Sequence, residues 1–194
     1  MKKRHSVSKL VGVAMLSSVA YVLMLLNFPI PPFPSFLMID FSEVPALLAA
    51  IIFGPMAGVL VEFFKNVLDY FFTGSATGVP VGHASNFVAG LLFVLPTAWF
   101  YNKLKSKKGL TAGLVVGTFI MAVSMGLLNY YVFLPAYTLF LGADTMTSEA
   151  MKTMVIQFIL PFNIIKGLIV TTMFMFIFRS LDSWISKQQL KYSV

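Results

Sequence analysis

The sequence contains no cysteine, and this absence excludes disulfide bonds, thiolate nucleophiles and cysteine-ligated metals. Its two histidines, His5 and His83, are far apart and form no HExxH motif, so we expect no metal centre. The GxxxxGK loop that binds nucleoside triphosphates is also missing, which excludes ATP hydrolysis by that route. We therefore expect no catalytic residue, no cofactor and no enzyme activity of the chain's own.

Charge is scarce as well. Charged residues make up 11% of the chain, against roughly 25% in soluble domains, and 58% of the residues are hydrophobic. This composition predicts one membrane domain of 194 residues. The net charge of +7 comes from short basic clusters between apolar runs. Such clusters are typical of membrane topology signals, so we expect a multi-pass protein of the cell membrane that binds no nucleic acid.

The apolar stretches predict an all-α membrane protein with six transmembrane helices in one bundle. We expect these helices at residues 9–28, 43–53, 55–72, 85–102, 110–135 and 153–179. The first stretch follows a basic start and contains Ser18-Val19-Ala20, which also fits a signal peptide with its cleavage site. Because the apolar run continues to Phe28, long enough to span a bilayer, we predict a retained helix.

Gly54-Pro55 divides residues 43–72, either as a turn between two helices or as a kink within one. A turn places the lysine-rich segment 103–108 on the same side of the membrane as the basic N-terminus, whereas a kink places it on the opposite side. Cytoplasmic loops are enriched in Lys and Arg. The turn is therefore favoured, and with it both termini in the cytoplasm.

The last apolar stretch carries a polar motif near its middle, where Asn163 and Lys166 project from one helix face. Inserting a charged side chain at that depth of a membrane costs roughly 2.5–3.5 kcal/mol, so such a residue usually has a functional role. Pro161 lacks the N–H that a helix interior requires, and Gly167 leaves room beside the backbone. With Asn129 these side chains predict a niche that reads the edge of a planar heterocycle, although a small anion would also suit Lys166.

The connector at residues 29–42 is rich in proline and unusually apolar. It either rests on the lipid headgroups or forms an extracellular lid over a binding cavity. We include four of its residues and one tyrosine of the fifth helix among the expected substrate-binding residues: Leu37, Met38, Ile39, Asp40 and Tyr130.

Glu62, Lys65, Asn66 and Asp69 lie in one arc of the third helix, where Lys65 has Glu62 three residues before it and Asp69 four after it. An internally paired set that fixes the helix register is one interpretation. A proton or ion relay, a gate and a partner contact are others. An intramembrane enzyme would need Glu62 and Asp69 in a water-filled cavity, and a purely structural membrane protein is a further alternative.

Small residues at four-residue spacing allow helices to approach closely. Gly113 and Gly117 predict such packing inside the bundle, whereas Ala14 and Ser18 predict a contact of the first helix with another subunit.

Several motifs, in this order, resemble the riboflavin-specific S component of energy-coupling factor (ECF) vitamin transporters. They are Asn27-Phe28-Pro29, Met38-Ile39-Asp40-Phe41-Ser42-Glu43-Val44-Pro45, Phe53-Gly54-Pro55, Glu62-x-x-Lys65-Asn66, Gly78-Val79-Pro80-Val81-Gly82, Leu128-Asn129-Tyr130 and Leu160-Pro161-Phe162-Asn163-Ile164-Ile165-Lys166-Gly167. The resemblance covers essentially the whole chain.

The resemblance implies a six-helix subunit that captures riboflavin from outside and delivers it inward with one transmembrane coupling protein and two cytoplasmic ATPase subunits. It implies that the loop after the first helix closes over the vitamin and that Asn129, Asn163 and Lys166 hold the isoalloxazine. The family's coupling face is usually Ala-x-x-x-Ala, which corresponds here to Ala14-x-x-x-Ser18. An S component for another vitamin and a solitary facilitator are the nearest alternatives.

Overall fold

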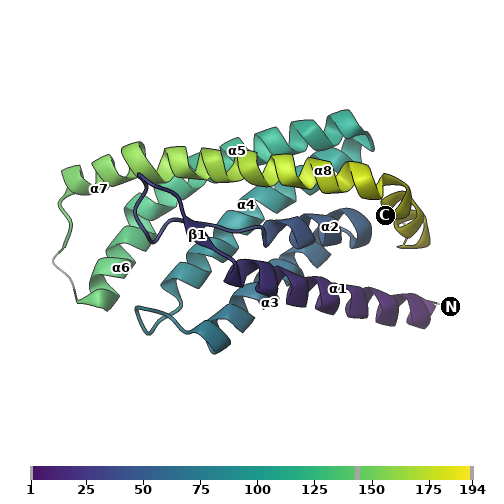
Figure 1. Cartoon of the computed structure of the whole chain (residues 1–194), viewed down its shortest axis with the longest axis horizontal. Coiled ribbons are helices and arrows are strands. Elements are labelled where there is room, and N and C mark those ends of the chain that lie inside the picture. The colour runs from purple at the N-terminus through teal and green to yellow at the C-terminus, as the bar shows by residue number, and fades with distance from the viewer. Residues whose placement is uncertain (1, 143–144, 193–194) are drawn as a thin grey trace.

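The computed structural model describes residues 2–142 and 145–192. Its helices pack side by side into an elongated bundle, and α1 begins at the same end of the molecule at which α8 finishes (Figure 1). The first part of the chain contributes α1 (Lys2–Leu25), β1 (Phe28–Pro29), β2 (Met38–Ile39), α2 (Glu43–Phe53), α3 (Pro55–Thr73) and α4 (Val81–Leu104). The second part contributes α5 (Lys107–Leu128), the π-helical turn η1 (Asn129–Phe133), α6 (Leu134–Leu141), α7 (Ser148–Met154), the π-helical turn η2 (Val155–Ile159) and α8 (Leu160–Tyr192).

Four helical stretches of the described residues are long and apolar enough to cross a membrane: Val7–Leu25, Val81–Leu104, Lys107–Leu141 and Ser148–Tyr192. The predicted all-α membrane class is thereby confirmed. The apolar helix α2 has only 11 residues, so it reaches about 16 Å, roughly half of a ~30 Å hydrocarbon layer.

The last helix is longer than predicted. We expected it at residues 153–179, whereas helical structure continues without a break from Ser148 to Tyr192. The additional turns contain Lys, Ser and Gln residues that lower the hydropathy but are compatible with a helix. The apolar pattern therefore indicated the apolar part of the helix and missed its polar ends.

Helix α2 occupies the centre of the bundle and packs against α1, α3, α4 and α8. All of its residues except Leu48 are buried, as expected for a helix that is apolar all round. Its first residue, Glu43, is therefore placed deep inside the protein. An antiparallel pair of short strands, β1 and β2, joins the end of α1 to the segment that leads into α2.

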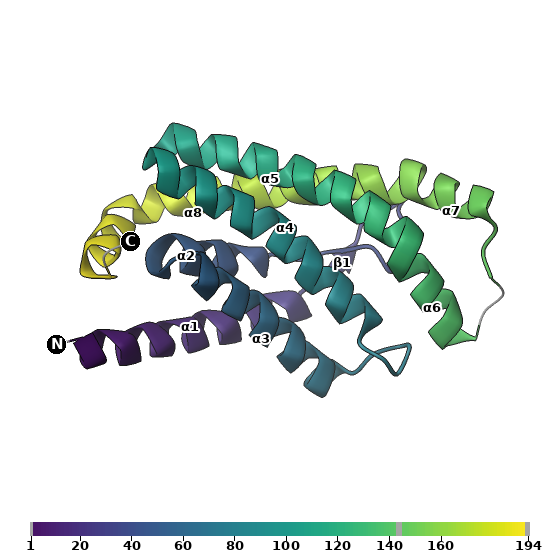
Figure 2. The same cartoon turned by 180° about the vertical axis from the view of Figure 1, so that it is seen from behind.

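Helices α4 and α5 lie side by side (Figure 2). Two glycines of α5 make this possible, as the four-residue spacing predicted. A Cβ atom on Gly113 would lie 2.8 Å from the backbone oxygen of Thr97, and one on Gly117 would lie 2.7 Å from that of Phe93. Any larger residue at these two positions would push the two helices apart.

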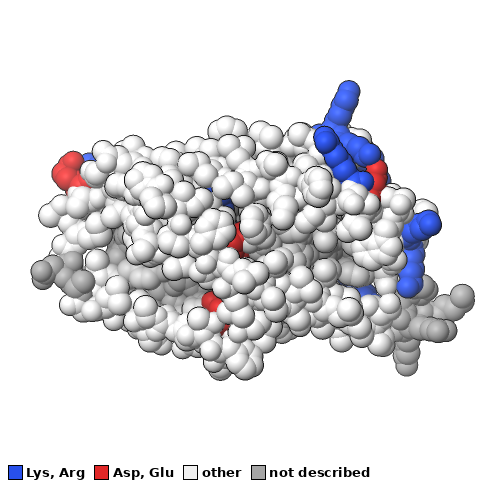
Figure 3. All heavy atoms as spheres, in the orientation of Figure 1, with Lys and Arg blue, Asp and Glu red and all other residues white. Residues whose placement is uncertain are grey.

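Exposed lysine and arginine side chains gather at the end of the bundle where α1 begins and α8 finishes (Figure 3). They belong to the segment 103–108 and to the last turns of α8. The middle of the visible face is uncharged apart from a few Asp or Glu atoms and Lys or Arg atoms set deep between the other side chains (Figure 3). The surface thus separates a basic end from a broad apolar belt.

Candidate ligand-binding site

A cavity of about 250 Å³ lies where the loop between α1 and α2 meets α3, α4, α5, α6 and α8. Met24, Leu37, Met125 and Phe162 are among its apolar lining residues. Most of its polar lining residues come from two groups of elements: Asp40, Asn129, Asn163 and Lys166 from the loop, η1 and α8, and Asp69, His83, Ser85 and Asn86 from α3 and α4. Apolar walls with a few placed polar groups are typical of small-molecule sites.

Asn129 and Asn163 both lie beside π-helical turns, because η1 begins at Asn129 and η2 ends at Ile159. Each carboxamide donates one N–H to a backbone oxygen of its own helix, Asn129 to Met125 at 2.8 Å and Asn163 to Ile159 at 2.8 Å. Within the described residues neither Oδ1 atom has a hydrogen-bond partner. Each side chain therefore keeps an acceptor and a second N–H for a ligand.

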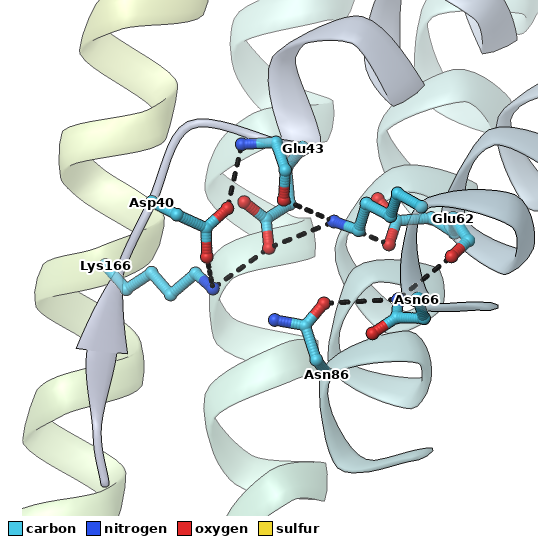
Figure 4. A network of polar contacts seen from close by, with 8 residues as sticks. Asp40, Glu43, Glu62, Asn66, Asn86 and Lys166 are labelled. Atoms are coloured by element: carbon cyan, nitrogen blue, oxygen red, sulfur yellow. Dashed lines mark hydrogen bonds and ion pairs between the residues drawn. The ribbon is translucent and has the colours of Figure 1, made fainter. Parts of the chain in front are cut away.

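Lys166 is 6% exposed, and its Nζ lies 3.3 Å from Asp40 Oδ2 and 3.0 Å from Glu43 Oε1 (Figure 4). Asp40 also accepts the backbone N–H of Ser42 at 2.8 Å, which fixes the chain just before α2. An ammonium group has three hydrogens. Two are directed to the carboxylates, so one remains for a neutral acceptor, while the positive charge of Lys166 is already balanced.

Glu43 extends this network to Lys65, whose side chain is fully buried. Lys65 Nζ lies 2.9 Å from Glu62 Oε2 and 3.7 Å from Glu43 Oε1, and it donates to Ser42 Oγ at 2.7 Å. The predicted pair between Lys65 and Glu62 is therefore present. We call Asp40, Glu43, Glu62, Lys65 and Lys166 the buried charge network.

The predicted pair between Lys65 and Asp69 is wrong. Asp69 Oδ2 instead lies 3.0 Å from His83 Nε2 of α4, and its Oδ1 accepts from Thr73 at 2.8 Å. The ammonium of Lys65 is already surrounded by Glu43 and Ser42 from α2 and by Glu62. Spacing along α3 indicated both partners but carried no information on the residues that α2 and α4 bring in.

Gly90 of α4 provides the space in which the Glu62 carboxylate lies. A Cβ atom at position 90 would overlap Oε1, Cδ and Oε2 of Glu62, and Glu62 is fully buried. We expect Gly90→Ala to displace Glu62 from Lys65 and to destabilise the protein by about 1–3 kcal/mol, as overpacking does. A thermal unfolding curve in detergent measures this loss.

Gly126→Ala is the matched control, because Gly126 is also a buried helical glycine. Its Cβ would meet only Val155 Cγ1, at the ordinary contact distance of 3.5 Å. We expect this variant to unfold at or above the temperature of the parent, since alanine favours helix. Equal stability of the two variants would contradict the role given to Gly90.

Residues 8–178 match the family model described as ECF transporter, substrate-specific component. The chain belongs to this family. The riboflavin transporter FmnP of Bacillus subtilis (strain 168) is 54% identical over 183 residues, which cover 94% of this chain and 96% of that protein. The riboflavin transporter RibU of Staphylococcus aureus (strain TCH60) is 38% identical over 179 residues, or 92% and 93% of the two chains.

A solved structure of the S component of a bacterial ECF transporter has a TM-score of 0.79 at 38% identity, and the match covers 93% of this chain and 98% of that one. The S-component fold is thus shown by sequence and by structure. These matches confirm the resemblance stated above and the prediction of a transporter component rather than an enzyme.

In this S component the cavity brings together six of the eight predicted binding residues: Leu37, Met38, Asp40, Asn129, Asn163 and Lys166. Ile39 is 0% exposed and does not line the cavity. Tyr130 also lies outside the lining and packs instead against the apolar cluster of Leu134, Val155 and Ile159. Alternation along β2 explains Ile39, because neighbouring strand residues point in opposite directions.

The loop between α1 and α2 takes part in the site. Phe36, Leu37 and Met38 line the cavity, and the ring of Phe33 packs edge-on against Phe162 of α8 with centroids 5.6 Å apart. These contacts favour the interpretation of the loop as a cover over the cavity rather than as a segment resting on headgroups.

Sequence reasoning missed the wall formed by α3 and α4. Asp69 was assigned to an intrahelical pair, and His83 was noted only as isolated. His83 and Asn86 are three residues apart at the start of α4 and so share a helix face, which was the available signal. Ala14 and Ser18 lie elsewhere, both exposed on α1.

Proposed function

We propose that this S component captures riboflavin from the extracellular side and delivers it inward together with a separate energising module. The observation that supports this most is the convergence of Asn129, Asn163 and Lys166 on one cavity in a chain that is 54% identical to a protein named a riboflavin transporter. Riboflavin carries a planar ring system with alternating N–H and C=O groups on one edge. Two carboxamides and one ammonium supply the complementary donors and acceptors.

The charge balance of the cavity favours a neutral ring over a small anion. Because Asp40 and Glu43 already neutralise Lys166, an anion would meet two carboxylates along with one ammonium. A carbonyl oxygen needs only the free N–H of the ammonium. The rings would be held between apolar side chains such as Leu37, Met125 and Phe162, which line the same cavity.

For the membrane arrangement we propose six crossings with both termini in the cytoplasm. The basic end of the bundle would face the cytoplasm, in accordance with the enrichment of Lys and Arg in cytoplasmic loops (Figure 3). The short helix α2 is acceptable at membrane depth because it is surrounded by protein and because Asp40 satisfies the backbone N–H of Ser42. The cavity then lies in the extracellular half.

For coupling we propose that α1 docks on a transmembrane coupling protein through Ala14 and Ser18, with two ATPase subunits supplying the energy. Both residues are exposed, beside the exposed side chains of Val11 and Met15. Ser18 Oγ donates to the backbone oxygen of Ala14 at 3.1 Å, so its hydroxyl group is turned back onto the helix. A serine at this position thus keeps the surface smooth enough for close helix approach.

A binding experiment tests the proposal. The purified protein in detergent is incubated with riboflavin, separated from free ligand, and its visible absorption spectrum is recorded. We expect a flavin spectrum at about one flavin per chain, and no displacement by an excess of thiamine or biotin. A preparation that stays colourless would refute riboflavin as the ligand, and displacement by another vitamin would assign the protein to that vitamin.

A further inference from the structure

The cavity has a second polar wall, formed by α3 and α4. Asp69, His83, Ser85 and Asn86 all line it, although none belongs to the group around Lys166. Asn86 Oδ1 accepts from Asn66 at 3.3 Å, and its amide nitrogen is turned away from Asn66 towards the side on which Lys166 lies (Figure 4). A ligand that fills the cavity therefore meets polar groups in two separate places.

Asp69 is held in place and is still reachable. Its Oδ2 lies 3.0 Å from His83 Nε2, its Oδ1 accepts from Thr73 at 2.8 Å, and the two paired side chains are 13% and 12% exposed. A carboxylate has about four lone-pair sites, so two remain for hydroxyl groups of a ligand. His83 Nδ1 is buried without a hydrogen-bond partner among the described residues. Among the described residues, the polar contact of the His83 ring is therefore made through Nε2, at Asp69.

Asp69 pairs with His83 and not with the lysine that lines the cavity. The lining contains Asp40, Asp69 and Lys166 as charged residues, and Lys166 is already shared between Asp40 and Glu43. Among the described residues that line the cavity, none on the wall formed by α3 and α4 is a Lys or Arg. A terminal phosphate carries a charge of about −1.5 to −2 near pH 7 and would find repulsion there instead of a partner.

We propose, resting on the proposed riboflavin function, that Asp69 is the residue that selects the side chain of the flavin. It accepts hydrogen bonds from the hydroxyl groups of the sugar-alcohol chain, and its negative charge excludes flavins with a terminal phosphate. His83 is a positioning residue that orients the carboxylate. Ser85 and Asn86 supply further neutral hydrogen-bonding groups on the same wall.

Asp69→Asn tests this proposal with three probes: riboflavin, riboflavin 5′-phosphate, and lumiflavin, which has the ring system but no hydroxyl chain. Dissociation constants are measured by quenching of flavin fluorescence. We expect the parent protein to bind riboflavin more tightly than the phosphate. In the variant, riboflavin should weaken about threefold to tenfold, the phosphate should bind about tenfold more tightly, and lumiflavin should not change. Asp182→Asn, which changes a partly exposed carboxylate paired with Lys107, is the matched control and should change none of the three.

A second variant separates charge from orientation. His83→Ala leaves the carboxylate in place but removes the group that orients it, so riboflavin should weaken while the phosphate remains excluded. An unchanged riboflavin-to-phosphate ratio in Asp69→Asn would overturn the proposal, as would an equal loss of lumiflavin, which would assign Asp69 to the fold. Neither result contradicts the proposed function. That function fails only if the parent protein does not bind riboflavin.

Discussion

Lys65→Met is expected to destabilise the protein more than any other substitution considered for the buried charge network. Lys65 is fully buried, and its ammonium is the ion-pair partner of Glu62 and a second partner of Glu43. Removing it leaves the Glu62 carboxylate in the core without a cation, and within the described residues Glu62 Oε1 has no hydrogen bond to compensate. Breaking a buried pair in this way costs about 3–5 kcal/mol. An apparent unfolding temperature in detergent should fall by roughly 10 °C.

Glu62→Gln combined with Lys65→Met is the informative control. A buried ion pair replaced as a whole by neutral residues of similar volume is often tolerated, because no charge is left unpaired. We therefore expect the double variant to recover most of the lost stability. A double variant as unstable as Lys65→Met alone would show that packing of the lysine chain, and not its charge, holds α2 against α3. Each variant is compared without ligand, so that binding does not add to the measured stability.

The local features of the fold were readable in the sequence. Gly54-Pro55 separates two helices in the structure, with Gly54 at a φ of 98° and Pro55 in the first turn of α3. Both residues have these preferences irrespective of the rest of the chain. The glycines of α5 likewise indicated a close helix contact without indicating which helix would make it. Local chemistry determines turns and small-residue faces, and these are the parts that a single sequence reports.

Long-range partners were not readable. Asn163 and Lys166 were recognised because a polar group at membrane depth is unusual whatever its neighbours are, and Asn129 because its carboxamide complements these two groups. The partners of Lys166, Asp40 and Glu43, lie more than a hundred residues away, and no spacing rule connects them. The same holds for Asp69 and His83, which belong to different helices. It is harder still to predict which apolar residues of the loop line the cavity, since Ile39 and Met38 differ only in the side of the strand from which they project.

Lys166→Ala is expected to weaken riboflavin binding by an order of magnitude or more. The substitution removes the ammonium that donates a hydrogen bond to a carbonyl oxygen of the ring. A hydrogen bond from a charged donor contributes about 1.5–3 kcal/mol, or roughly tenfold to 150-fold in affinity. The loss should appear mainly as faster release, measurable by chasing bound flavin with an unlabelled competitor. Lys152→Ala removes an exposed lysine that is paired with Glu149 and should leave the affinity unchanged.

The effect of Lys166→Ala on the stability of the fold must be separated from its effect on the contact with the ligand, because the substitution also removes the ammonium that is paired with Asp40. The double variant Asp40→Asn with Lys166→Met removes one charge of each sign and should regain stability in the ligand-free protein. If Lys166 binds the ring directly, the affinity of this double variant stays low despite the regained stability. If the lysine only neutralises acids around the cavity, the double variant binds riboflavin as well as the parent does. The two roles of Lys166 thus predict opposite results in one titration. Removing Asp40 together with Lys166 restores the balance of charge, but it does not restore a hydrogen bond that Lys166 donates to the ring.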